Sequence, residues 1–219
     1  MSDRFTLNIS PEVLAKTFEL PQIPQYEARY NIAPKQNISI VRHVGNQNKL
    51  VSLQWGMIPN GSKDNSQPFT TVSSETVNEN PVFSHAIQHN RCIIPASGFY
   101  QWHDINTNNK HPYYVHLANS TVIGIAGLWD RWQAEDGHEI ETCCIITTAA
   151  NDIIHPIHER MPLILLPENY NLWLNNNMQD INELQKLYHP YTSDIMFAYP
   201  VPELVNNTRF DSASCIVRV

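Results

Sequence analysis

The chain has 219 residues, 42% of them hydrophobic, which is enough for one domain with a sizeable core. Its net charge of -7, from 14 Lys and Arg against 21 Asp and Glu, argues against strong non-specific DNA binding, which normally needs a basic surface. Apolar runs stay below the ~20 residues of a membrane helix, and the first residues lack a basic stretch followed by an apolar one. We therefore expect a cytoplasmic protein without membrane contact.

The predicted elements of the first half are short. Residues 10–18 are typical of a helix, with Ser10 as N-cap and Pro11 at the first helical position. Strands are predicted over 37–44 and 49–58 around the turn GNQN, and a polar loop follows over 58–70. A second helix is predicted over 80–89. The helix faces that we expect to be buried consist of Val13, Leu14, Thr17 and Phe18 in the first helix and Val82, Phe83, Ala86 and Ile87 in the second.

The second half is richer in predicted strands. RCIIPASGFYQWH indicates a strand, a turn and a strand, and PYYVHLA and TVIGIAGLWD are predicted to form a hairpin over Asn119 and Ser120. The remaining elements that we expect are a buried strand over 141–150, short helices over 167–174 and 180–189, and closing strands over 194–201 and 214–219. Many short strands and 15 prolines favour a mixed, mostly antiparallel α+β fold with a single domain over residues 1–219.

Metal and cofactor motifs are weak. Cys143 and Cys144 are neighbours on a predicted strand and point to opposite faces, so they do not jointly hold a metal ion. His155 and His158 are separated by Pro156, which disfavours a helical pair of metal ligands. We expect four reduced, mostly buried thiols, no metal site and no cofactor.

Gln101 is a polar residue between two aromatic ones, Tyr100 and Trp102. By strand alternation it points away from both. If the aromatic side chains are in the core, Gln101 faces solvent; if they are not, it lines a pocket. The periodicity does not decide between these alternatives.

A series of short strings resembles the SRAP family, the SOS-response-associated peptidases, also called abasic-site processing proteins. The strings stand in the order of the family and cover the chain from Arg4 to about Ile216: DRF, RYNIAP, WGMIP, SSET, RCIIPASGFYQW, AGLWD, TTAAN, IHERMPLIL and the tail YPVPELVNN. The resemblance implies one domain with a barrel-like β core and short flanking helices.

The resemblance also implies a chemistry. In the family, removal of the initiator methionine exposes a cysteine, whose amine attacks the aldehyde of an abasic site in single-stranded DNA. The thiol then closes a thiazolidine ring on the Schiff base. An α-amino group with a pKa of about 8 and an adjacent thiol suit these two steps at neutral pH. An asparagine, a glutamate and a histidine position and protonate the adduct.

Most of the family's catalytic positions are substituted here. The cysteine falls on Ser2, the asparagine on Thr71 and the glutamate on Gln101, whereas the histidine is kept as His158. Serine is a poor nucleophile unless a base activates it, and an amide does not exchange protons as a carboxylate does. The substitutions therefore predict a protein that has lost the covalent reaction.

The expected DNA contacts are few. The resemblance places Ser73 at a family arginine, and Asp3 puts a negative charge where a family glycine stands. The loop over 59–69 lacks the tryptophans that wedge between bases in some members. The residues implied to bind DNA are Arg4, Arg29, Ser73, Thr148 and Arg160.

Three functions stay open at this point. The first is a catalytically silent homologue that binds single-stranded or abasic DNA weakly as a monomer. The second is an interaction protein that binds no DNA. In the third, the exposed amine of Ser2 forms a reversible Schiff base.

Overall fold

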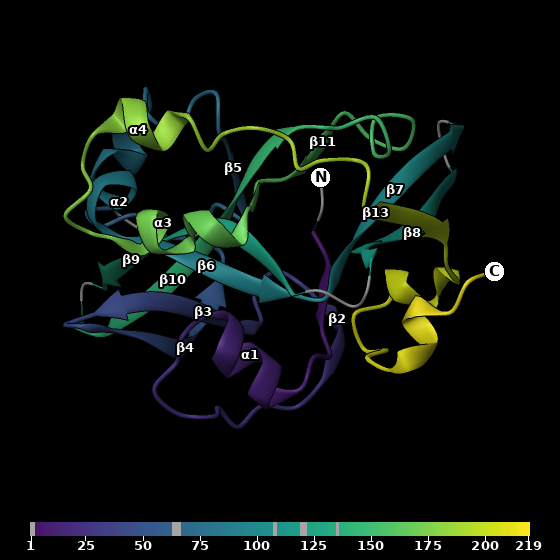
Figure 1. Cartoon of the computed structure of the whole chain (residues 1–219), viewed down its shortest axis with the longest axis horizontal. Coiled ribbons are helices and arrows are strands. Elements are labelled where there is room, and N and C mark those ends of the chain that lie inside the picture. The colour runs from purple at the N-terminus through teal and green to yellow at the C-terminus, as the bar shows by residue number, and fades with distance from the viewer. Residues whose placement is uncertain (1–2, 63–66, 107–108, 119–121, 135) are drawn as a thin grey trace.

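The computed structural model describes residues 3–62, 67–106, 109–118, 122–134 and 136–219, with the side chains of 106 and 109 left aside. Two β-sheets and short helices build the molecule (Figure 1). The first sheet has five strands in the order β13-β8-β7-β1-β2, and every neighbouring pair in it is antiparallel. Its strands are β1 (Phe5–Leu7), β2 (Arg29–Ile32), β7 (Gly98–Asn106), β8 (Asn109–Leu117) and β13 (Met196–Pro200).

The second sheet closes into a barrel. β10 pairs with both β4 and β9, so the order β10-β4-β3-β6-β9 returns to its starting strand. This closure removes the free edges of five strands. The strands of the second sheet are β3 (Asn37–Val44), β4 (Gln47–Trp55), β5 (Thr71–Ser73), β6 (Arg91–Ala96), β9 (Ile123–Gln133), β10 (Glu139–Ala149), β11 (Arg160–Pro162) and β12 (Ile164–Leu165).

Short helices cover the sheets from outside. Figure 1 shows α2, α3 and α4 gathered at one end of the second sheet and α1 below it. Ser10 caps α1, because its side chain accepts a hydrogen bond from the Val13 amide. The helices are α1 (Pro11–Thr17), α2 (Ser84–His89), α3 (Tyr170–Leu174) and α4 (Ile181–Gln185), with 3₁₀ turns η1 (Pro81–Phe83), η3 (Pro167–Asn169), η4 (Glu203–Asn206) and η5 (Ala213–Ile216).

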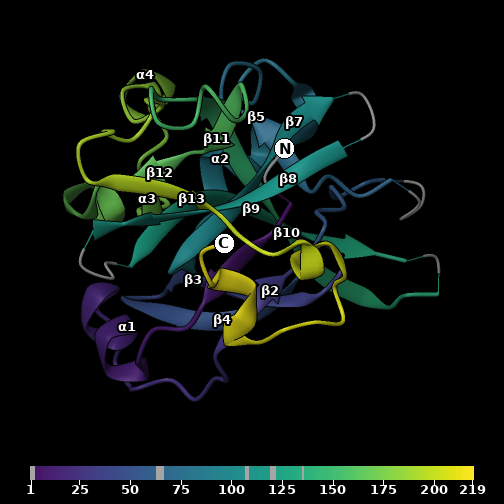
Figure 2. The same ribbon diagram turned by 90° about the vertical axis from the view of Figure 1, so that its right-hand side faces the viewer.

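The core has two parts. The main cluster fills the barrel, and Cys92, Cys143 and Cys144 are completely buried in it as free thiols. A smaller cluster lies between the first sheet and the C-terminal segment, which Figure 2 shows beside β2. That smaller cluster consists of Tyr100, Tyr114, Val201, Val205 and Cys215.

A buried arginine joins the helices to the barrel. Arg91, at the start of β6, is 1% exposed. Its guanidinium donates hydrogen bonds to five carbonyl groups, which satisfy it without an acidic partner. These carbonyls belong to Ile87, Gln88, Trp173, Asn175 and Met178.

The structure confirms the α+β class, the barrel-like core and the strand over 37–44. The predicted hairpin over Asn119 and Ser120 is wrong in its pairing: β8 belongs to the first sheet and β9 to the second, and those two residues lie outside the described ones. Each strand instead pairs with its other sequence neighbour, in the hairpins β7–β8 and β9–β10.

Three smaller expectations also differ from the structure. The closing strand predicted over 214–219 is wrong, because η5 forms there and Cys215 is buried in the smaller cluster. Val13 and Val82, predicted to face inward, are 46% and 42% exposed. Their neighbours Leu14 and Phe83, which were also predicted to face inward, are buried. In the described part of the chain, no helix is long and apolar enough to cross a membrane.

Candidate functional site

A cavity of about 340 Å³ opens beside the start of β1. Segments from both sheets and from the C-terminal part of the chain supply its walls. The predicted residue Ser2 lies outside the described residues, but the next residue, Asp3, is part of the wall. The cavity, which we call the His158 cleft, is lined by Asp3, Arg4, Trp102, Lys110, His158 and Asn206.

Gln101 directly precedes the cleft residue Trp102 in β7 and is fully buried. Its Nε2 donates a 2.7 Å hydrogen bond to the carbonyl oxygen of Arg160. The sequence left two alternatives, a solvent-facing Gln101 or a Gln101 that lines a pocket beside exposed aromatic residues. Neither describes the structure fully, because Tyr100 on the other face of β7 is also fully buried. Both faces are covered: one by the start of β11, the other by the C-terminal segment. An ionised carboxylate in place of this amide would have no proton to donate to the carbonyl oxygen of Arg160.

His158 is oriented by the backbone of the same segment. Its Nδ1 accepts a 2.9 Å hydrogen bond from the amide of Arg160, which places the proton of the neutral ring on Nε2. Burial lowers the pKa of His158, so the neutral form predominates at pH 7. The imidazole therefore presents a neutral N–H donor rather than a cation.

Arg160 is a half-buried cation that already forms an ion pair with Glu75. Its guanidinium binds both carboxylate oxygens of Glu75 at 2.8 Å, and it also donates to the carbonyl of Thr147 at 2.8 Å. The hydrogen bonds from Arg160 lower the pKa of Glu75 to about 2. Ser73, at 3.4 Å from Arg160, also donates to Glu75. The positive charge of Arg160 is therefore largely balanced.

Arg4 lines the cleft, and hydrogen bonds to residues outside the cleft lining hold its guanidinium in place. Its Nη1 donates to Asn31 Oδ1 at 3.0 Å and to the carbonyl of Val205 at 2.7 Å. Its guanidinium lies 6.0 Å from the ring centroid of Trp102, whose indole N–H donates to Asn206 at 2.7 Å. Burial lowers the pKa of the Arg4 guanidinium, which is still charged at pH 7.

Arg29 has a different placement from Arg4. It forms an ion pair with Asp211 and donates to Gln36 Oε1 at 2.6 Å. Asp211 also accepts a 3.0 Å hydrogen bond from the amide of Asn31. In this structure Arg29 ties the C-terminal segment to β2, and it is not among the residues that line the His158 cleft.

The other predicted residues lie on strands of the second sheet and are not among the residues that line the cleft. Thr71 and Ser73 are in β5, which runs parallel to β10, and Thr148 in β10 pairs with Met161 of β11 and is 2% exposed. Hydrogen bonds connect Ser73, Arg160 and Gln101, and the Arg160 amide continues this connection to His158.

Several residues of the cleft were not predicted as site residues. Trp102 directly follows Gln101, and Asn206 lies within the tail string of the resemblance, so both had a signal nearby. Lys110 had none, because only the β7–β8 hairpin brings it to the cleft, where it forms a 2.9 Å ion pair with Asp104. Glu75 stood within SSET, but its pairing with Arg160 depends on β10 lying between β5 and β11.

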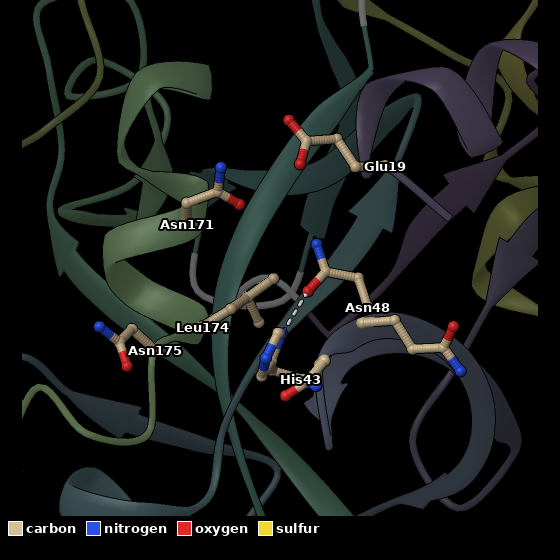
Figure 3. Close-up of a pocket in the computed structure, with 8 residues that line it drawn as sticks. Glu19, His43, Asn48, Asn171, Leu174 and Asn175 are labelled. Atoms are coloured by element: carbon tan, nitrogen blue, oxygen red, sulfur yellow. Dashed lines mark hydrogen bonds between the residues drawn. The ribbon is translucent and has the colours of Figure 1, made fainter. Parts of the chain in front are cut away.

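A second cavity of about 320 Å³ lies between α1, α3 and the β3–β4 hairpin (Figure 3). His43 and Asn48 point toward each other there, with 2.9 Å between Nδ1 and Oδ1, and Asn48 also donates to the Phe18 carbonyl. These polar groups satisfy one another. None of the residues predicted as site residues lines this cavity.

The two sheets and the barrel define an α+β protein, the class that the resemblance implied. The sequence matches the family description SOS response associated peptidase (SRAP) over residues 1–208. The chain belongs to the SRAP family.

Named relatives support this assignment. The chain is 38% identical to the abasic site processing protein YoqW of Bacillus subtilis (strain 168), over 99% of both chains. It is 25% identical to the abasic site processing protein HMCES of Xenopus tropicalis, over 89% of this chain and 67% of that protein. A crystal structure of a Bacteroides thetaiotaomicron protein superposes with a TM-score of 0.87 at 23% identity, over 99% of both chains.

Proposed function

We propose that this chain recognises abasic sites in single-stranded DNA and that it has lost the covalent cross-linking step. The names of its relatives support recognition of the lesion. The observation that carries the loss is Gln101: where the family pattern has a glutamate, a buried amide donates to the Arg160 carbonyl. An amide in this bond neither takes up nor releases a proton, so the general acid–base step has no carboxylate at this position.

The nucleophile is also changed. Ser2 stands where the family has a cysteine, and a hydroxyl is a much weaker nucleophile than a thiol at neutral pH. A ring closed by serine oxygen would be an oxazolidine, which water opens readily. We therefore expect reversible binding of the abasic site in place of a stable covalent adduct.

Weak binding follows from the charges around the cleft. Arg160 is paired with Glu75, and Lys110 with Asp104. Arg4 donates to protein acceptors as well. Few cations are left to release counterions from DNA, so we expect low affinity that falls steeply with salt.

The test uses one single-stranded oligonucleotide with a central abasic site and the same oligonucleotide with an intact base. Fluorescence anisotropy at low salt measures binding, and denaturing gels with and without borohydride detect covalent products. We expect preference for the abasic strand and no cross-link in either gel. A borohydride-dependent band would support the reversible Schiff base instead, and equal binding of both strands would support an interaction protein.

We also propose that the protein acts as a monomer in the cytoplasm. Its formal net charge of -7 favours mutual repulsion between copies. Light scattering at micromolar concentration would show a mass near 25.1 kDa for a monomer. A mass of twice that value would contradict the monomer.

A further inference from the structure

Asp3 brings a carboxylate into the His158 cleft. It lines the same cavity as His158 and Arg4, at the position where the family pattern has a glycine. Its Oδ1 is buried, and none of the described residues donates a hydrogen bond to it. A buried carboxylate oxygen without a donor costs free energy, which a ligand with a hydroxyl group would recover.

The nearby donors are already engaged. Arg4 donates to Asn31 and Val205, and Lys110 donates to Asp104 at the rim. The His158 N–H is fixed in direction by the bond that its Nδ1 accepts. The missing donor for Asp3 is therefore most simply supplied by the molecule that enters the cavity.

An abasic sugar exists in two forms with different hydrogen-bonding properties. The ring-opened form carries at C1′ an aldehyde, which only accepts hydrogen bonds, and its free hydroxyl group is on C4′. The closed ring carries a hydroxyl group on C1′, which donates one. A carboxylate that faces C1′ discriminates between the two forms because it only accepts.

We propose that Asp3 accepts a hydrogen bond from the C1′ hydroxyl of the closed-ring abasic sugar, so that this chain reads the hemiacetal form of the lesion. This inference rests on the proposed function and names the form of the substrate. It explains how a carboxylate that repels phosphate is useful in a DNA-binding cleft. The volume of about 340 Å³ and the indole wall of Trp102 accommodate one sugar without a base.

The test compares three single-stranded oligonucleotides with identical flanks. One carries the natural abasic site, one the tetrahydrofuran analogue without a C1′ hydroxyl, and one the closed ring with a methoxy group on C1′. We expect the natural site to bind about tenfold more tightly than either analogue, because both leave the carboxylate without a donor. Equal affinities for all three would overturn the inference, while preference of all three over an intact strand would keep the proposed function.

Variants separate hydrogen bonding from Schiff-base formation, which also needs the natural site. In Asp3→Gly the preference for the natural site should disappear, whereas a Schiff base would keep it, since the chain's amine is unchanged. Asp152→Asn is the matched control, because it removes one negative charge at an exposed residue that is not part of the cavity lining. It should change all three affinities alike and leave their ratio at about ten.

Two checks complete the design. Intact mass establishes which residue is at the N-terminus, and thermal unfolding establishes that each variant is folded. A folded Asp3→Gly protein that keeps the tenfold preference would overturn the inference. Failure of the unmodified chain to distinguish any abasic strand from the intact one would overturn the proposed function as well.

Discussion

At the scale of single residues, we expect Gln101 and Glu75 to set how the cleft responds to protons and charge. The Gln101 amide is committed to a carbonyl oxygen, and Glu75 occupies the guanidinium of Arg160. Both contacts reach Arg160, one through its backbone and one through its side chain. A substitution of Gln101 or of Glu75 therefore affects the cleft through Arg160, and the two effects are measurable separately.

Gln101→Glu should make stability depend on pH. Burial and the facing Arg160 carbonyl would raise the pKa of the new carboxyl above its unfolded value of about 4.3. A raised pKa in the folded state means that the variant is as stable as the original below about pH 4.3 and loses stability as pH rises through the folded pKa. We expect a loss of about 2–4 kcal/mol at pH 8 from urea unfolding. The control, exposed Gln133→Glu, should lose almost nothing at either pH, and the same result for the Gln101 variant would contradict the burial argument.

Glu75→Gln should tighten binding to single-stranded DNA. The substitution removes the charge that balances Arg160, and the freed guanidinium then reaches phosphate. We expect a gain of about three- to tenfold at low salt and a steeper salt dependence, by close to one counterion. Glu183→Gln, which removes the carboxylate paired with Lys186 at the end of α4, is the matched control. If both variants bind alike, the Arg160 side chain is not part of the DNA surface.

At the scale of elements, the C-terminal segment forms one wall of the site. Asn31 in β2 is fully buried and donates to carbonyls of the segment. Its Oδ1 accepts from Arg4, so the same side chain fixes the segment and the cation of the cleft. This double contact gives RYNIAP a physical role in placing Arg4 and Asn206. The carbonyls that Asn31 binds belong to Val205, Asn207 and Phe210.

Asn31→Ala should loosen this wall. Three carbonyl groups and Arg4 each lose one hydrogen bond, and we expect a loss of about 2–3 kcal/mol in the free energy of unfolding. Limited proteolysis should cut within 203–216 while the barrel stays intact. Asn46→Ala, an exposed position in the β3–β4 turn, serves as control. Unchanged protection of the segment in the Asn31 variant would contradict its role.

At the scale of the whole molecule, local patterns predicted elements better than their pairing. The alternation in NISIVRHV predicted β3, and Ser10-Pro11 predicted the start of α1. The assignment of β8 and β9 to different sheets depends on barrel closure by β10, which no local pattern reports. The same holds for the site: the linear motifs pointed to Gln101 and His158, whereas Lys110 reaches the cleft only through the folded hairpin.

The most direct test of the central claim, that this SRAP cleft binds the lesion but lacks the groups for covalent capture, is restoration of those groups. Denaturing gels would compare the original chain, Ser2→Cys alone and a fivefold variant on abasic single-stranded DNA, with removal of Met1 checked by mass. We expect a stable cross-link from the fivefold variant, little or none from Ser2→Cys, and none from the original, since groups that act as a unit are not additive. A stable cross-link from the original chain, or none from a folded fivefold variant with Met1 removed, would contradict the account. The fivefold variant combines Ser2→Cys, Asp3→Gly, Thr71→Asn, Ser73→Arg and Gln101→Glu.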